Sequence, residues 1–126
     1  MARILVVDDE EDIRLLLREV LEDAGYEVVE AGNGDEALRR YWATPTDLVI
    51  TDIVLPGKGG MEIIRELRRQ TPEVPIIVMS GCDRLTTLDW FATDEPLRVQ
   101  RVFQKPFRLL ELCEAVREGC PHKHPS

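Results

Sequence analysis

Carboxylates, one hydroxyl and one ammonium group follow short apolar runs along this chain of 126 residues. Asp8 and Asp9 end the run ILVV, and Asp52 ends the segment LVITD. Ser80 follows IIVM, and Lys105 follows VFQ. Runs of this kind are typical of buried strands, and ligands of α/β proteins bind beyond the carboxyl ends of parallel strands. The five residues are therefore predicted to meet along one edge of a sheet.

Three carboxylates at one edge would repel each other strongly. If Asp8, Asp9 and Asp52 come within about 4 Å, each pair costs on the order of 4 kcal/mol at an effective dielectric near 20. Mg²⁺ offsets this cost and keeps coordination positions open for a phosphate. Ser80 alone is explained equally well as a helix cap, and Lys105 alone as a surface charge. Together they supply a hydrogen-bond donor and a positive charge for a phosphoryl oxygen.

The three acidic residues that follow, Glu10, Glu11 and Asp12, have a simpler explanation. Acidic side chains near a helix N-terminus each stabilise the helix by roughly 0.3–1 kcal/mol. We therefore interpret these three residues as the start of a helix and not as ligands.

Alternating strands and helices would position the site. Five apolar runs have the length of strands: residues 4–7, 26–29, 48–50, 76–79 and 99–103. Four segments between or after them show helical spacing: Ile13, Leu16, Leu17, Val20, Leu21 and Ala24, closed by Gly25; Ala37, Leu38, Tyr41 and Trp42; Met61, Ile64 and Leu67; and Leu109, Leu112, Cys113, Val116 and Cys120. Nearly wholly apolar strands that alternate with helices predict a parallel sheet covered on both faces, in an α/β sandwich.

Composition narrows the classes of partner. The net charge of −8 opposes unaided binding to nucleic acid, and no apolar run approaches the roughly 20 residues of a membrane span. We therefore expect a cytosolic (cytoplasmic) protein with reduced thiols, because Cys82, Cys113 and Cys120 form no CxxC pair. Cys113 is interpreted as a core residue. His122 and His124 with Cys120 are interpreted as part of a disordered tail rather than a metal site.

The motifs ILVVDDEED, AGNGDEAL, DLVITDIVLPGKGGMEII, PIIVMSG and QKPF occur in this order. In these motifs the chain resembles the receiver domain of two-component response regulators over nearly all of residues 2–119. The resemblance implies a flavodoxin-like (CheY-like) five-stranded parallel sheet of order 2-1-3-4-5 with helices on both faces. We accordingly expect one receiver domain over residues 1–120 and a tail over residues 121–126.

The resemblance also implies a metal site. In the family pattern, Mg²⁺ is held by Asp9, by Asp52 and by the backbone carbonyl of Val54, while Asp8 acts mostly through water. The glycine-rich stretch after Asp52 is expected to give the following loop room to turn.

The same resemblance implies the phosphoryl chemistry. Asp52 is the phosphoacceptor, served by a histidine kinase or a histidine phosphotransfer protein. Ser80 binds the phosphoryl group once it has formed, and Lys105 pairs with its oxygens. Gly81 is expected to leave space above the site, and the Lys105–Pro106 bond is expected to be cis, as in the family. The protein would assist only its own phosphorylation and dephosphorylation, and would not otherwise be an enzyme.

Two departures from the family concern output. The family usually has an aromatic residue three places before the lysine, and this chain has Val102, which is too small and stiff to report phosphorylation by rotating. The segment before the fifth expected strand is also unusual, so its helix is expected to be short, shifted or partly unwound. We predict that residues 81–98, with Trp90 near the centre, move on phosphorylation and contact a downstream protein.

Several alternatives remain open. A stand-alone receiver without an output domain is favoured over a receiver from a hybrid histidine kinase and over a non-phosphorylated adaptor. A flavodoxin-type carrier would need a hydroxyl-rich loop where this chain has five acids. An aspartyl phosphohydrolase commonly has a second aspartate where this chain has Val54. The apolar Val54, together with Cys82, also predicts a phosphoryl lifetime that is not especially short.

Overall fold

The computed structural model describes residues 2–53, 55, 59–81 and 99–119. Five parallel strands form one sheet of order β2-β1-β3-β4-β5. The strands are β1 (Arg3–Val7), β2 (Glu27–Ala31), β3 (Leu48–Asp52), β4 (Ile76–Ser80) and β5 (Arg101–Gln104). The predicted sheet and strand order are confirmed.

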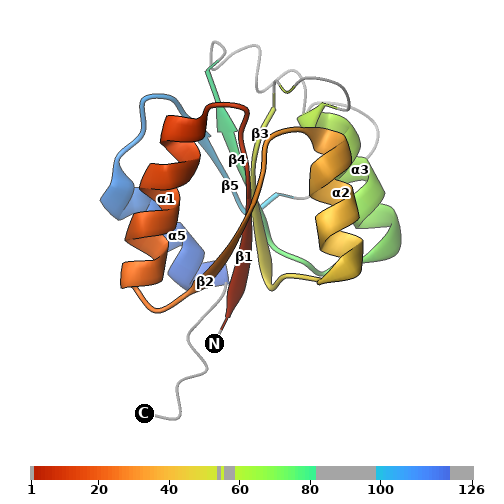
Figure 1. Ribbon diagram of the computed structural model, residues 1–126, viewed down its shortest axis with the longest axis horizontal. Coiled ribbons are helices and arrows are strands. Elements are labelled where there is room, and N and C mark those ends of the chain that lie inside the picture. The colour runs from red at the N-terminus through yellow and green to blue at the C-terminus, as the bar shows by residue number, and fades with distance from the viewer. Residues whose placement is uncertain (1, 54, 56–58, 82–98, 120–126) are drawn as a thin grey trace.

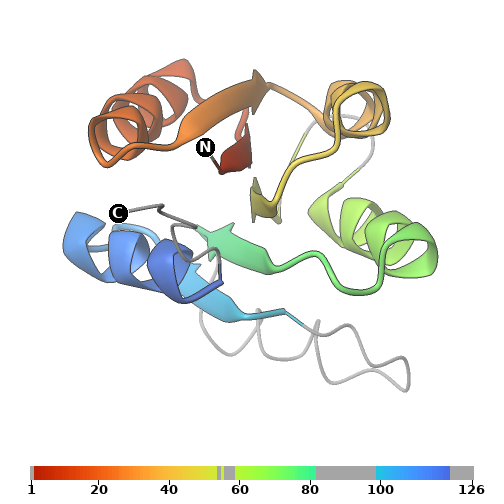
Figure 2. The same cartoon turned by 90° about the horizontal axis from the view of Figure 1, so that it is seen from below.

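Helices cover both faces of the sheet. They are α1 (Glu11–Asp23), α2 (Gly34–Ala43), α3 (Gly60–Gln70) and α5 (Leu109–Gly119). Figures 1 and 2 show α1 and α5 on one face and α2 and α3 on the other. The helix expected before the fifth strand and the expected tail lie outside the described residues. In the part of the chain that the structure describes, no helix is both long and apolar enough to cross a membrane.

Alternation along each strand divides the core into two layers. Ile4 and Val6 of β1 pack towards α1 and α5, while Leu5 and Val7 pack towards α2 and α3. Side chains of successive strand residues point to opposite faces, so an apolar run can serve both layers. This double burial of β1, β3 and β4 explains why these strands lack an alternating polar pattern.

The first helix ends as its sequence predicts, with a small shift in position. Ala24 is the residue at the C-cap, and Gly25 follows it with φ of 98°. The Gly25 amide donates to the carbonyl of Glu22, and the Tyr26 amide donates to that of Leu21. This is the bonding of a Schellman motif, in which glycine adopts the left-handed conformation at low cost.

Three residues on the predicted helical stripes, Leu16, Ala24 and Trp42, are exposed, and Cys113 is half-buried. Leu16 is 41% exposed and Trp42 is 43% exposed, so both were wrongly assigned to the buried stripes. Leu16 precedes the buried Leu17, and Trp42 follows the buried Tyr41. Because adjacent helical residues point about 100° apart, the neighbour of a buried residue faces away from the core. Cys113 lies at the edge of the core, where burial raises the pKa of its thiol.

Candidate functional site

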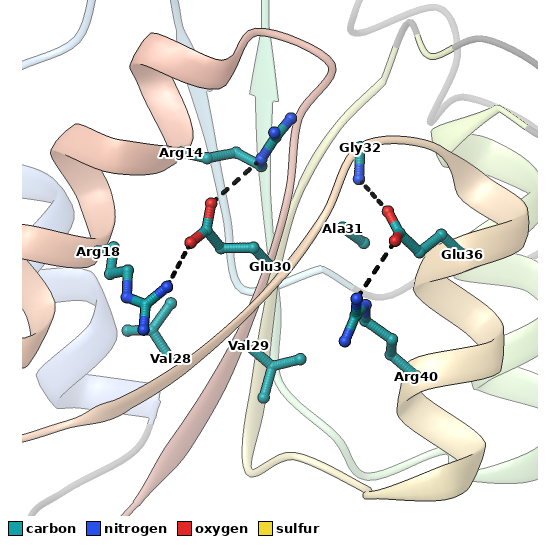
Figure 3. Close-up of a pocket in the computed structure, with 9 residues that line it drawn as sticks. All are labelled: Arg14, Arg18, Val28, Val29, Glu30, Ala31, Gly32, Glu36 and Arg40. Carbon is teal, nitrogen blue, oxygen red and sulfur yellow. Dashed lines mark hydrogen bonds and ion pairs between the residues drawn. The ribbon is translucent and has the colours of Figure 1, made fainter.

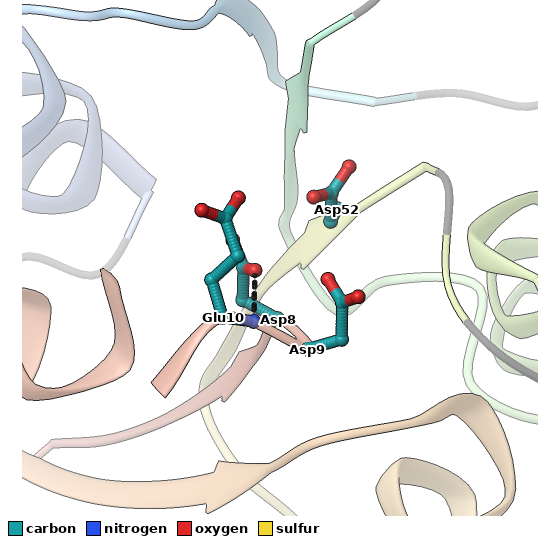
Figure 4. Close-up of side chains that lie close together, drawn as sticks. All are labelled: Asp8, Asp9, Glu10 and Asp52. Atoms are coloured by element: carbon teal, nitrogen blue, oxygen red, sulfur yellow. Dashed lines mark hydrogen bonds between the residues drawn. The ribbon is translucent and has the colours of Figure 1, made fainter. Parts of the chain in front are cut away.

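The predicted carboxylates meet at the carboxyl ends of β1 and β3. These strands are adjacent in the sheet, so Asp8, which follows β1, lies beside the end of β3 at Asp52. Asp8, Asp9, Glu10 and Asp52 each offer a carboxylate oxygen, and these oxygens all lie within 4.8 Å of one another. Figure 4 shows the four side chains converging. We call these four residues the acidic cluster.

Lys105 neutralises part of this charge. Its Nζ donates to Asp8 Oδ2 at 2.8 Å, to Asp52 Oδ2 at 2.8 Å and to Glu10 Oε1 at 3.2 Å. An ammonium group has three donors, so these three bonds use all of them. Burial acts to lower the pKa of Lys105, but the hydrogen bonds to Asp52 and Asp8 outweigh it and raise the pKa above its ordinary value.

Backbone contacts hold Lys105 in place. Its amide donates to the carbonyl of Ser80 at 2.7 Å, and the predicted cis peptide bond between Lys105 and Pro106 is present. Ser80 ends β4, is buried, and lies opposite Gln104 in the register of β4 with β5. Among the described residues, no atom lies within 4 Å of a Cβ atom added to Gly81, in agreement with the predicted space beside Ser80.

Glu10 belongs to the acidic cluster, contrary to its interpretation as a helix-start residue alone. It is the N-cap of α1 with an extended backbone, and its exposed carboxylate turns back to Lys105. Glu11 and Asp12 occupy the first turn of α1, as expected. The signal in the sequence was the position of Glu10 directly after Asp9, but a helix-end preference explained it equally well.

The loop after Asp52 needs glycine at one described position. A Cβ atom on Gly60 would collide with the carbonyl oxygen of Asp52 and lie 2.7 Å from Cα of Ile53. The Gly60 amide donates to the carbonyl of Ile53 at 2.9 Å. This close approach lets the start of α3 pack against the end of β3. The predicted carbonyl ligand of Val54 lies outside the described residues.

Comparison with known proteins decides the family. The family model of the response regulator receiver domain matches residues 4–117. The chain belongs to the response regulator receiver domain family. The receiver resemblance inferred from the motifs is therefore correct, and the fold agrees with it.

Relatives of the receiver domain differ in length. The chain is 34% identical to sporulation initiation phosphotransferase F of Bacillus subtilis, covering 96% of this chain and 95% of that protein. It is 42% identical to the alkaline phosphatase synthesis transcriptional regulatory protein PhoP of the same organism, but over 64% of this chain and only 34% of that protein. The chain therefore spans nearly all of one relative and about a third of another.

A solved receiver structure is also similar. The response regulator TrrA of Thermotoga maritima, crystallised in complex with Mg²⁺ and BeF, matches with a TM-score of 0.81 and 38% identity. The match covers 94% of this chain and 99% of that chain.

The donor set of this receiver fits Mg²⁺. Only oxygen ligands are offered, which suits a hard divalent cation. Within the described ranges, the Asp9 carboxylate accepts no hydrogen bond, and Figure 4 shows it pointing towards Asp52. A single ammonium cannot balance four carboxylates, so the acidic cluster keeps net negative charge for a cation.

The output-related residues are described in part. Val102 lies on β5 and is 38% exposed, so no buried ring occupies this position. The guanidinium of Arg101 lies 4.9 Å from the ring centre of Phe103 on the same strand. Residues 82–98, including Trp90 and Cys82, lie outside the described residues, so the expected mobile surface stays a prediction.

Asp8→Asn is expected to stabilise the metal-free receiver at neutral pH and to weaken Mg²⁺ binding. Asparagine retains the oxygen that accepts from the Glu10 amide at 2.9 Å but removes one buried negative charge, a gain on the order of 1 kcal/mol. Burial, with the charge of Asp52, raises the pKa of Asp8 above 3.8 despite the bond to Lys105.

The pH dependence follows from that direction. The folded state keeps the Asp8 proton to higher pH than the unfolded state, so ionisation destabilises the wild type above the folded pKa and has no effect below pH 3.8. The advantage of Asp8→Asn should therefore shrink as the pH is lowered towards 3.8. Urea unfolding across pH, with and without Mg²⁺, measures this. A less stable variant with an intact Mg²⁺ response would mean that the bond between Asp8 and Lys105 dominates.

Proposed function

We propose that this receiver domain is a signalling switch that accepts a phosphoryl group on Asp52 with the help of Mg²⁺. The observation that supports it best is the position of the Lys105 ammonium, 2.8 Å from both Asp8 and Asp52 at the open edge of the sheet. A lysine that only stabilised the fold would need one carboxylate partner, whereas Lys105 is surrounded by more carboxylates than one ammonium group can neutralise.

The acceptor and its neighbours have distinct tasks in this proposal. Asp9 and Asp52, with the carbonyl of Val54, would hold Mg²⁺, and Asp8 would act mostly through water. When bound, Mg²⁺ supplies charge neutralisation for the transferring group. Once the phosphoryl group has formed, Lys105 would donate a hydrogen bond to a phosphoryl oxygen in place of the Asp52 carboxylate. The buried Ser80 would donate to a second phosphoryl oxygen. Catalysis in such transfers is mainly positioning and electrostatic stabilisation.

The product changes the charge of the site. A phosphoryl group adds roughly −1.5 to −2 charge where one carboxylate stood. No described residue has an atom within 4 Å of a Cβ atom placed on Gly81, which supports room for this group and for a shift of the end of β4. Transmission would pass through residues 81–98 to a downstream protein, since the exposed Val102 offers no ring to rotate. The role is that of a regulatory phosphoacceptor, which assists only its own modification.

The donor would be a histidine kinase or a histidine phosphotransfer protein in the cytosol. The similarity along 95% of a relative named as a phosphotransferase supports a relay role. The net charge of −8 supports a protein partner over nucleic acid.

A small phosphodonor tests the proposal. The wild type, incubated with Mg²⁺ and an acyl phosphate, is expected to gain one phosphoryl group in intact-mass analysis. A parallel sample with a chelator should gain far less, because the acidic cluster then repels the anionic donor. An unchanged mass under conditions that modify another receiver would favour the non-phosphorylated adaptor instead.

A further inference from the structure

Arg14 of α1 reaches the backbone of the acidic cluster. Its Nη1 donates to the carbonyl oxygen of Asp8 at 2.6 Å, while its Nε donates to Glu30 Oε1 at 3.2 Å. The Glu30 carboxylate is held on its other oxygen by Arg18 Nη1 at 2.8 Å. Figure 3 shows Glu30 between the two arginines, at a groove beside the edge strand β2. One guanidinium thus connects β2 to the peptide bond that precedes Asp9.

That peptide bond matters because, in the part of the chain described, the Asp9 side chain has no hydrogen-bond or ion-pair partner. The Asp9 side chain is exposed and accepts no described hydrogen bond, so the backbone sets where its carboxylate points. The Asp8 amide donates to the carbonyl of Ala31, and the Asp8 carbonyl accepts from Arg14. The Asp8 amide belongs to the preceding peptide unit, so removing Arg14 takes away the hydrogen bond on the Asp8–Asp9 unit itself and leaves only its neighbour held by Ala31.

The surroundings of the guanidinium fit a fixed position. A Cβ atom on Gly32 would lie 3.3 Å from Arg14 Nη1, so glycine at this position leaves just enough room for the guanidinium. The side chains of Arg14 and Glu30 are each about one-fifth exposed, which limits how much solvent screens their ion pair. Lysine has no planar fork and could not reach both acceptors in the same way.

We propose that Arg14 is a positioning residue for Mg²⁺, which sets the Asp9 carboxylate through the Asp8 carbonyl. The inference rests on the proposed function, since the metal is the one that would serve phosphoryl transfer. The direction in which Mg²⁺ affinity changes when Arg14 is replaced distinguishes a positioning role from a purely electrostatic one. Removing a positive charge near a cation site should by electrostatics alone tighten Mg²⁺ binding, whereas loss of positioning should weaken it.

The experiment compares Arg14→Gln with Arg18→Gln. Arg18 lies one turn further along α1 and binds the same Glu30 carboxylate. Among the described residues, it donates to Glu22 and Glu30 and not to Asp8. Mg²⁺ dissociation constants are measured by calorimetry on folded proteins without phosphodonor. We expect Arg14→Gln to bind Mg²⁺ roughly 10-fold more weakly, as for other residues that orient metal ligands. Arg18→Gln should bind as the wild type does or slightly more tightly.

Two further variants keep the test decisive if Arg14→Gln is poorly folded. Arg14→Lys should recover part of the affinity, and Glu30→Gln should weaken Mg²⁺ binding less than Arg14→Gln. Amide hydrogen exchange adds a metal-free measurement, in which Asp9 and Glu10 should exchange faster in the Arg14 variants than in Arg18→Gln. Equal or tighter Mg²⁺ binding by the Arg14 variants, relative to Arg18→Gln, overturns the proposal.

Failure of this inference and failure of the proposed function are distinguishable. A wild type that is phosphorylated, with equal Mg²⁺ binding by Arg14→Gln and Arg18→Gln, removes only the role of Arg14. A wild type that is never phosphorylated, with the expected order of Mg²⁺ affinities, removes only the phosphoacceptor function.

Discussion

Asp52→Asn is expected to reduce phosphoryl uptake from a small phosphodonor to an undetectable level. The asparagine oxygen can still accept a hydrogen bond from Lys105, so the packing at the end of β3 should remain intact. An amide cannot act as the carboxylate nucleophile that forms an acyl phosphate. The variant also removes one of four negative charges from the acidic cluster, so its metal-free stability should not fall.

Asp35→Asn is the matched control for this variant. Asp35 is an exposed aspartate in the first turn of α2, and it is not part of the acidic cluster. This control should take up phosphoryl groups as the wild type does. Labelling of Asp52→Asn equal to that of the wild type would place the acceptor elsewhere, and fragment mass analysis would then locate it.

Lys105→Met is expected to lower the free energy of unfolding of the metal-free protein at neutral pH by roughly 3 kcal/mol, the lower range for breaking a buried ion pair. Methionine fills a similar length but leaves the buried carboxylates of Asp8 and Asp52 without their shared cation. Because small domains are stable by only about 5–15 kcal/mol, this is a large fraction of the total. Mg²⁺ should recover part of the loss by supplying positive charge.

Urea unfolding with and without Mg²⁺ measures this effect, with Arg69→Met as the control. Arg69 makes an exposed ion pair with Glu66 at 3.2 Å, which is worth about 1 kcal/mol or less. The pKa of Lys105 is raised above 10.5, so its contribution is complete below that pH wherever the carboxylates are ionised. Equal stability of Lys105→Met and the wild type at neutral pH, with no response to Mg²⁺, would contradict the electrostatic account.

Much of the site was predictable because strand ends are visible in the sequence. A parallel sheet collects its carboxyl ends at one edge, so Asp8, Asp52, Ser80 and Lys105 could be brought together from the apolar runs alone. The order of the strands needed more than periodicity. It came from the family resemblance, since alternation of strands and helices does not by itself fix which strand lies in the centre.

Side-chain direction was the part that the sequence could not supply. The carboxylate of Glu10 turns towards Lys105 because the residue sits at the N-cap with an extended backbone, and a residue's type does not encode that turn. Nothing in the sequence singled out Arg14, although its guanidinium connects α1 with β2 and with the acidic cluster. Leu16 and Trp42 were wrongly predicted to be buried because the buried face of each helix is narrower than its band of apolar residues.

The bond between Lys105 and Asp8 joins residues 97 positions apart. Chains are made from the N-terminus, so all four acids of the cluster exist before their ammonium partner has been synthesised. A nascent or truncated chain that ends before β5 thus carries Asp52 without the ammonium group that pairs with it. In the proposed function, the phosphoacceptor site is therefore complete only after the last strand has been synthesised.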